Sequence, residues 1–115
     1  MSLFEAARPN PAGYRDVAPS ELTLPARGYT IIDVRQPEEY VGELGHIAGA
    51  KLVPMAALLA EAASWDKDAE YLMVCKAGGR SASSAQALLR AGFAKVVNLS
   101  GGMLAWNAAA LPVER

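Results

Sequence analysis

The residues best suited to chemistry in this chain are its only cysteine, Cys75, and the six residues that follow it. An apolar run over 71–74 ends at the cysteine and a helical pattern begins at Ala82, so the sequence predicts a strand, a tight loop and a helix. Glycines let the backbone N–H groups of such a loop turn toward one point, where the N-terminus of the helix adds its positive dipole end. We therefore expect an anion site in the loop Cys75-Lys76-Ala77-Gly78-Gly79-Arg80-Ser81, here called the Cys75 loop.

The thiol of Cys75 is expected to be a nucleophile, because helix N-termini and neighbouring cations such as Lys76 and Arg80 favour the thiolate. The competing interpretation is a small buried apolar side chain at the end of a strand, since free cysteines are among the most buried residues. A single cysteine excludes an intramolecular disulfide and a redox cycle between two thiols of one chain. With only one histidine in the chain, the cysteine cannot complete a zinc site, so no metal or organic cofactor is implied.

Further segments resemble the signature blocks of the single-domain rhodaneses, sulfurtransferases that carry sulfane sulfur as a cysteine persulfide. The Cys75 loop supplies a CxxGxR block, which alone would be a weak signal. The other blocks are DVR at 33–35, EY at 39–40, GHIAGA at 45–50, and NLSGG at 98–102 followed by Trp106. They follow one another in the order expected for the family, from about Thr30 to Trp106, and this agreement makes the resemblance specific.

The resemblance implies a double-displacement reaction at Cys75. The thiolate would take the outer sulfur of a small anionic donor, thiosulfate or a persulfide, and would pass it to cyanide, to a thiol or to a protein that accepts sulfur. Every species at this sulfur is anionic, so backbone N–H donors from Lys76 through Ser81 suit all of them. Gly78 and Gly79 would supply the permissive backbone, and Ser81 is placed where its N–H and hydroxyl could cap the helix and face the sulfur.

The remaining polar residues of the blocks have supporting roles in this interpretation. Arg80 either locks the loop through a bidentate bond to a carboxylate or to backbone carbonyls, which we favour, or points to the bound anion. Lys76 either steers anionic donors or is simply solvated. Asp33 and Arg35 are expected to form an ion pair or hydrogen-bond network beneath the loop. His46 is expected to support the structure, because a thiolate that is already formed needs no base.

Two positions depart from the two-domain thiosulfate enzymes that the chain resembles. Those enzymes carry a basic residue just before the aromatic residue that aligns with Tyr40, and another two places after the cysteine. Glu39 and Ala77 occupy these places here. Because the site then carries less positive charge, we expect weak capture of dianionic thiosulfate and a persulfide as the physiological donor.

Two other functions fit parts of the pattern. Phosphatases and arsenate reductases that share this fold have a longer loop, CxxxxxR, whereas Cys75 and Arg80 have the shorter spacing CxxxxR. A non-catalytic binding module would usually lack the cysteine. A persulfide carrier of low activity, or an interaction module, that serves one dedicated partner protein stays compatible with the sequence.

Runs of β-branched and apolar residues alternate with helical patterns along the chain, which predicts an α/β fold. Strands are expected near 14–17, 29–33, 51–53, 71–74 and 95–98, and helices over 36–41, after Pro54, over 81–91 and over 102–109. We expect a rhodanese-like central parallel sheet of about five strands with helices on both faces. Asp33, Cys75 and Asn98 each follow or end a strand, so they should converge at the carboxyl edge of that sheet.

Length and composition indicate one domain. We expect an irregular N-terminal arm over 1–13, and the resemblance implies a single rhodanese-like domain over 14–115. The formal net charge of -1 gives no reason to expect nucleic acid or an anionic membrane as a partner. The first residues lack the apolar core and basic flank of a signal peptide, and no window is long enough to span a membrane. We therefore expect a cytoplasmic protein.

Overall fold

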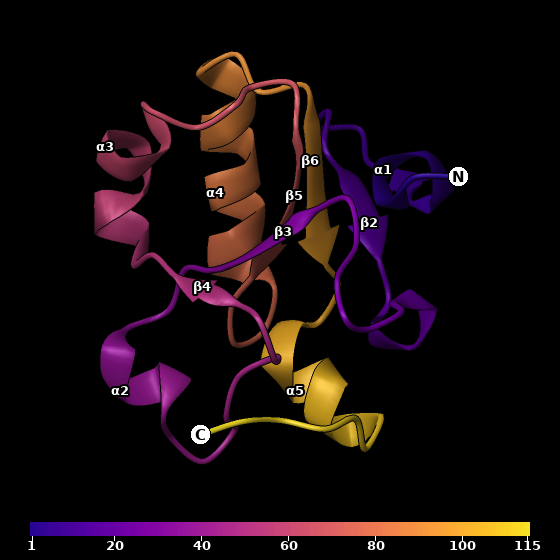
Figure 1. Ribbon diagram of the computed structural model, residues 1–115, viewed down its shortest axis with the longest axis vertical. Helices are drawn as coiled ribbons and strands as arrows, with labels where there is room; N and C mark the ends of the chain where they lie inside the picture. Colours follow the sequence, from indigo (N-terminus) through magenta and orange to yellow (C-terminus); the bar gives the residue numbers. More distant parts are fainter.

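The computed structural model describes residues 1–115 and is built around a six-stranded sheet (Figure 1). The strands are β1 (Arg8–Pro9), β2 (Arg15–Val17), β3 (Thr30–Asp33), β4 (Lys51–Leu52), β5 (Glu70–Val74) and β6 (Lys95–Leu99), in the spatial order β1-β2-β6-β5-β3-β4. The five strands from β2 to β4 in this order are parallel, and β1 pairs antiparallel with β2. The predicted α/β class with a parallel central sheet is confirmed, and one antiparallel strand is added at its edge.

Helices cover both faces of the sheet (Figure 1). They are α1 (Leu3–Ala6), α2 (Pro37–Tyr40), α3 (Leu58–Ala62), α4 (Gly79–Arg90) and α5 (Gly102–Ala108), with short 3₁₀ helices η1 (Pro19–Glu21) and η2 (Met55–Ala57). Side chains that alternate along each strand point to opposite faces, so the neighbours Ile31 and Ile32 belong to two separate cores. One core packs against α3 and α4, and the other packs against α5. None of the helices is both long and apolar enough to cross a membrane.

The N-terminal segment is more ordered than the irregular arm that the sequence predicted for residues 1–13. Helix α1 begins with a capping box in which the Ser2 and Glu5 side chains bind each other's backbone N–H groups. Strand β1 then pairs with β2, and the Phe4 N–H donates to the Glu70 side chain at 2.7 Å. Strand β2, predicted near residues 14–17, is flanked by β1 and β6. Strand β1 has only two residues, which are too few to show a hydrophobic period, and for this reason the sequence did not reveal it.

In the helix predicted after Pro54, the helical spacing of Met55, Leu58, Leu59 and Ala62 predicts one apolar face, and the structure departs from it. Leu58 and Ala62 are buried as expected, but 39% of Met55 and 54% of Leu59 are exposed. The first turn, η2, is a 3₁₀ helix with three residues per turn, and it is followed by the α-helical α3. Because the turn angle changes between η2 and α3, Met55 does not share the buried face of Leu58 and Ala62. Leu59 follows Leu58 in α3, about 100° farther around the helix, and points away from that face.

The carboxyl ends of β3, β5 and β6 meet at one edge of the sheet. Residues pair there in register, with Asp33 beside Val74 and Met73 beside Asn98. Cys75 follows directly after Val74, so the predicted convergence of Asp33, Cys75 and Asn98 is present. Helix α4 starts at Gly79, two residues before the expected start at Ser81. The loop between β5 and α4 is therefore very short, which places Cys75 close to the N-terminus of α4.

Candidate active site

The Cys75 loop folds back over the sulfur of its own first residue. The side chain of Cys75 is buried, and its Sγ accepts a hydrogen bond from the Gly78 N–H at 3.0 Å. Gly78 has a φ of 102°, a left-handed conformation that glycine adopts without steric cost, and it caps the start of α4. The Ser81 Oγ lies 3.2 Å from the same sulfur. The sulfur is thus held between a loop amide and the first turn of a twelve-residue helix.

Helix α5 supports the Cys75 loop from behind. The Met103 N–H donates to the Cys75 carbonyl and the Leu104 N–H donates to the Lys76 carbonyl, each at 2.9 Å. Gly101 and Gly102 both have positive φ, and Gly102 lies directly against the peptide between Cys75 and Lys76. This contact gives the NLSGG block a physical role that the sequence analysis did not assign. The sequence feature that could have indicated this contact is the pair of glycines, Gly101 and Gly102, shortly after β6.

A buried polar chain leads away from the sulfur toward the N-terminal segment. The Ser81 Oγ is 2.6 Å from the Asn98 Oδ1, and the Asn98 Nδ2 is 3.4 Å from the Asp16 Oδ1. The second carboxylate oxygen of Asp16 accepts from the Asn10 Nδ2 at 2.9 Å. Ser81 is fully buried and 5% of Asn98 is exposed. Sequence reasoning included Ser81 and the position of Asn98 but gave no role to Asp16 or Asn10.

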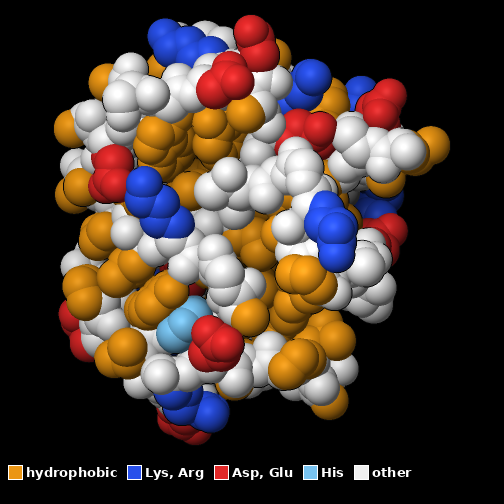
Figure 2. Space-filling model, viewed as in Figure 1, with side chains coloured by type: hydrophobic (Ala, Val, Ile, Leu, Met, Phe, Trp, Pro, Cys, Tyr) orange, Lys and Arg blue, Asp and Glu red, His pale blue; other side chains and the backbone are white.

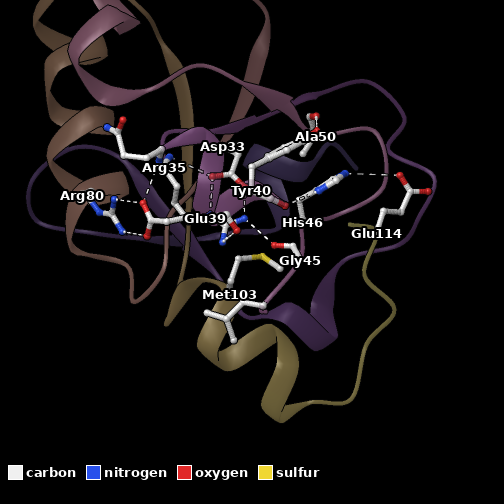
Figure 3. A network of polar contacts seen from close by, with 12 residues as sticks. Asp33, Arg35, Glu39, Tyr40, Gly45, His46, Ala50, Arg80, Met103 and Glu114 are labelled. Carbon is white, nitrogen blue, oxygen red and sulfur yellow. Dashed lines mark hydrogen bonds and ion pairs between the residues drawn. The ribbon is translucent and has the colours of Figure 1, made fainter. Parts of the chain in front are cut away.

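Arg80 is held by a carboxylate from another element. Its Nη1 and Nη2 donate to the two carboxylate oxygens of Glu39 in α2, both at 2.8 Å (Figure 3). These hydrogen bonds lower the pKa of Glu39 from 4.5 to about 2 and raise the pKa of Arg80. The geometry matches the locking role that the sequence favoured for Arg80. Glu39, interpreted from the sequence as a missing positive charge, forms the other half of this lock.

A buried ion pair lies next to the lock. The Arg35 Nη2 and Nε donate to the Asp33 carboxylate at 2.7 and 2.9 Å, and only 1% of each side chain is exposed. The remaining Arg35 hydrogens reach the backbone carbonyls of Glu39 and Gly45, at 3.2 and 2.7 Å (Figure 3). The ion pair therefore fixes the backbone of α2, and α2 presents Glu39 to Arg80.

His46 belongs to a separate group of contacts. Its Nδ1 lies 2.8 Å from the Tyr40 carbonyl, and its ring stacks on the Tyr40 ring with centroids 3.7 Å apart (Figure 3). Its backbone pairs with Glu114, and its Nε2 is 3.8 Å from the Glu114 carboxylate. The Tyr40 hydroxyl donates to the Ala50 carbonyl at 2.6 Å. These contacts connect α2 to the C-terminal segment.

An open cleft of about 410 Å³ lies beside the Cys75 loop. Its lining includes Lys76 and the apolar side chains of Leu44 and Leu104, together with the carboxylates of Glu38 and Glu43. Lys76 is exposed. Elsewhere, on the face shown in Figure 2, Lys and Arg are interspersed with Asp and Glu. A dianion approaching through the cleft would therefore meet acidic side chains as well as Lys76. No group of three or more His, Cys, Asp or Glu side chains is placed to hold a metal ion.

The pair of Arg80 and Glu39 should make stability depend on pH. The folded-state pKa of Glu39 is lowered, so the contribution of the pair is complete above about pH 4.5 and is lost as the pH falls toward 2. Because 37% of the Arg80 side chain and 29% of the Glu39 side chain are exposed, we expect about 1 kcal/mol at neutral pH. Urea unfolding of the wild type and of Glu39→Gln between pH 2 and 7 measures the contribution of this pair to the free energy of unfolding. A difference that does not shrink at low pH would contradict this assignment.

The fold and the loop define a class of protein: an α/β domain whose thiol accepts a hydrogen bond from a loop amide at the carboxyl edge of a parallel sheet. The model of the Rhodanese-like domain family matches residues 19–109. The chain belongs to this family.

Relatives and solved structures agree with this membership. The chain is similar to the thiosulfate sulfurtransferase GlpE of Pseudomonas entomophila, with 33% identity over 95 residues that cover 82% of this chain and 85% of GlpE. A rhodanese-related protein from Thermoplasma volcanium superposes with a TM-score of 0.76 at 29% identity, covering 86% of this chain and 96% of that one.

Other relatives are longer than this chain. The uncharacterised protein slr1261 of Synechocystis is 35% identical over 85 residues, which are 74% of this chain and 46% of that protein. MoeZ of Mycobacterium tuberculosis, whose name includes adenylyltransferase and sulfurtransferase, is 38% identical over 82 residues, which are 70% of this chain and 20% of MoeZ. The chain thus spans between a fifth and about half of these two proteins.

Proposed function

We propose that this protein is a sulfurtransferase that carries sulfane sulfur as a persulfide on Cys75. The observation that supports this best is the hydrogen bond from the Gly78 N–H to the Cys75 Sγ, in a loop that opens α4. An amide and a helix N-terminus stabilise negative charge without a proton transfer, so they suit both anionic states of the proposed site, the thiolate and the persulfide. The name of GlpE, a thiosulfate sulfurtransferase, supports the same chemistry.

The proposed reaction has two displacements at sulfur. The Cys75 thiolate attacks the outer sulfur of the donor, a new S–S bond forms, and the old bond breaks so that sulfite or a thiolate leaves with the electron pair. An acceptor such as cyanide then attacks the outer sulfur of the persulfide. The S–S bond breaks, its electron pair returns to Cys75 as a thiolate, and thiocyanate departs. The amides from Lys76 through Ser81 would hold the charge throughout.

The donor that we propose is a persulfide, from a small molecule or a protein, rather than thiosulfate. The cleft beside the loop carries Glu38 and Glu43, and its one exposed cation is Lys76. Glu39 is neutralised by Arg80, so Arg80 is not free to bind a dianion. A carrier that passes sulfur to one partner protein, with little activity toward cyanide, is the alternative. Cytoplasmic location stays a prediction.

Intact-mass spectrometry tests the proposal directly. After exposure to a donor, the wild type should gain about one sulfur mass, and cyanide or a thiol should remove it, whereas Cys75→Ser should gain none. A low-molecular-weight persulfide should load Cys75 at lower concentration than thiosulfate does. Absence of the adduct with every donor, while Cys75 still reacts with iodoacetamide, would contradict sulfur transfer. Saturation at micromolar thiosulfate would contradict the choice of donor.

A further inference from the structure

We infer that Asp16, acting through Asn98, holds the hydroxyl hydrogen of Ser81 away from the Cys75 sulfur, and is thereby a positioning residue for this thiol. A serine hydroxyl has one hydrogen to donate. Three acceptors surround the Ser81 Oγ: the Asn98 Oδ1 at 2.6 Å, the Gly78 carbonyl at 3.2 Å and the Cys75 Sγ at 3.2 Å. The short distance to Asn98 marks the bond that receives the hydrogen.

Asp16 determines which end of the Asn98 amide faces Ser81. The parallel register of β2 and β6 places Asp16 directly beside Asn98. A carboxylate only accepts hydrogen bonds, so the Asn98 NH₂ must turn toward Asp16, and its oxygen must then face Ser81. If the amide turned over, its oxygen would oppose the carboxylate. Ser81 and Asn98 are buried, so bulk water does not reach the bond between them, whereas the bond between Asn98 and Asp16 is only partly buried.

The Ser81 oxygen consequently presents lone pairs, not a hydrogen, to the Cys75 sulfur. A thiol can donate its S–H to that oxygen, whereas a thiolate at the same place gains nothing from it. In a persulfide the charge lies on the outer sulfur, and the inner Sγ is neutral. This step rests on the proposed function: the hydroxyl direction disfavours the free thiolate relative to the loaded persulfide, so the site is built to hold sulfur rather than to release it quickly.

The other charges around Cys75 are largely balanced. Apart from Asp16, the charged side chains in and directly around the loop are Lys76 and Arg80 in the loop and α4, Glu39 in α2, and Asp33 and Arg35 at the end of β3. Glu38 and Glu43 line the open cleft beside the loop. Arg80 is paired with Glu39, and Arg35 is paired with Asp33. Helix α5 carries no ionisable side chain. Lys76 is exposed to solvent. The direction of the Ser81 hydroxyl is therefore the feature next to the sulfur that a single substitution can reverse.

The substitution Asp16→Asn should reverse the chain of hydrogen bonds with little change of shape. The Asn10 NH₂ needs an acceptor, so it holds the oxygen of the new amide and leaves its NH₂ facing Asn98. Asn98 must then turn its oxygen to that NH₂ and its own NH₂ to Ser81, which frees the Ser81 hydrogen. The Cys75 Sγ and the Gly78 carbonyl are both 3.2 Å away, and the thiolate, which carries a full charge, is the stronger acceptor of the two. The rate of iodoacetamide alkylation should then rise at lower pH, with a midpoint about one pH unit below that of the wild type.

A control must separate this effect from the loss of a negative charge, which also favours the thiolate. The charge effect of Asp16→Asn persists in a Ser81→Ala background, but the hydroxyl effect does not. We expect most of the shift to vanish in that background. Equal shifts in both backgrounds, or no shift in either, would overturn the inference.

Ser81→Ala alone gives a second test if Asp16→Asn does not fold. With the hydroxyl hydrogen directed to Asn98, its removal should not raise the alkylation midpoint. A rise of about one pH unit would show that Ser81 already donates to the thiolate, and would overturn the inference. Neither alkylation test involves sulfur transfer. A result that overturns this inference therefore leaves the proposed function untouched. If both hold, loaded Asp16→Asn should release sulfur to cyanide about threefold faster, because Cys75 becomes a better leaving group.

Discussion

Replacing Gly102 with alanine should destabilise the protein by about 3–5 kcal/mol and displace the Cys75 loop. A Cβ on Gly102 would collide with the Cys75 carbonyl oxygen and would lie 2.7 Å from the carbonyl carbon and oxygen of Lys76. The φ of 55° is a further cost for any residue with a Cβ. These neighbours are backbone atoms, so no side chain can rotate away. Relief requires α5 to separate from the loop, which breaks the bonds that Met103 and Leu104 donate.

Two glycines of the same chain provide matched controls. Gly49 has a φ of 84°, but no atom lies within 4 Å of the place that a Cβ would take, so Gly49→Ala measures the conformational cost alone. Gly79 has neither positive φ nor a close neighbour, so Gly79→Ala should be tolerated. Urea unfolding gives the stability of each variant, and intact mass after donor exposure gives the loading of Cys75. A Gly102→Ala protein as stable as Gly49→Ala would show that the loop does not depend on this contact.

The local part of the site could be predicted from the sequence because it is formed by consecutive residues. The apolar run before Cys75, the glycines after it and the helical pattern beyond them indicate a strand, a loop and a helix without knowledge of any other segment. The parallel topology then places Asp33, Cys75 and Asn98 at one edge. Local sequence patterns and one topological rule were therefore sufficient to find the candidate nucleophile, Cys75, and the elements around it.

The contacts that join distant segments could not be predicted in the same way. Glu39 and Arg80 are 41 residues apart, and Asp16 and Asn98 are 82 apart. Nothing in the sequence near Glu39 shows that α2 turns this carboxylate toward α4. A comparison of residue types alone therefore suggested a loss of positive charge, whereas the structure shows a lock. Likewise, the partner of Asp16 follows from the register of β2 on β6, which depends on the whole sheet.

Replacing Arg35 with methionine should cost about 3–5 kcal/mol, because it leaves a buried carboxylate without its counter-ion. Asp33 is fully buried and would keep only the hydrogen bond from the backbone N–H of residue 35, at 3.2 Å. The Gly45 carbonyl would also lose its donor, and the Glu39 carbonyl would keep only the N–H of Gly42. Urea unfolding at neutral pH measures the loss. This loss would be a large share of the free energy of unfolding of a typical domain, which is roughly 5–15 kcal/mol.

Two further variants separate the unpaired charge from the lost packing. Arg8→Met breaks the exposed pair with Glu21 and should change stability little, because solvent already screens both charges. The double variant Asp33→Asn with Arg35→Met removes the unpaired charge and should regain part of the loss. A double variant as unstable as Arg35→Met would mean that packing, not charge, dominates. Because Arg35 also fixes the backbone that carries Glu39, the double variant should regain stability without regaining the Arg80 lock, so its Cys75 should still load sulfur less completely than the wild type.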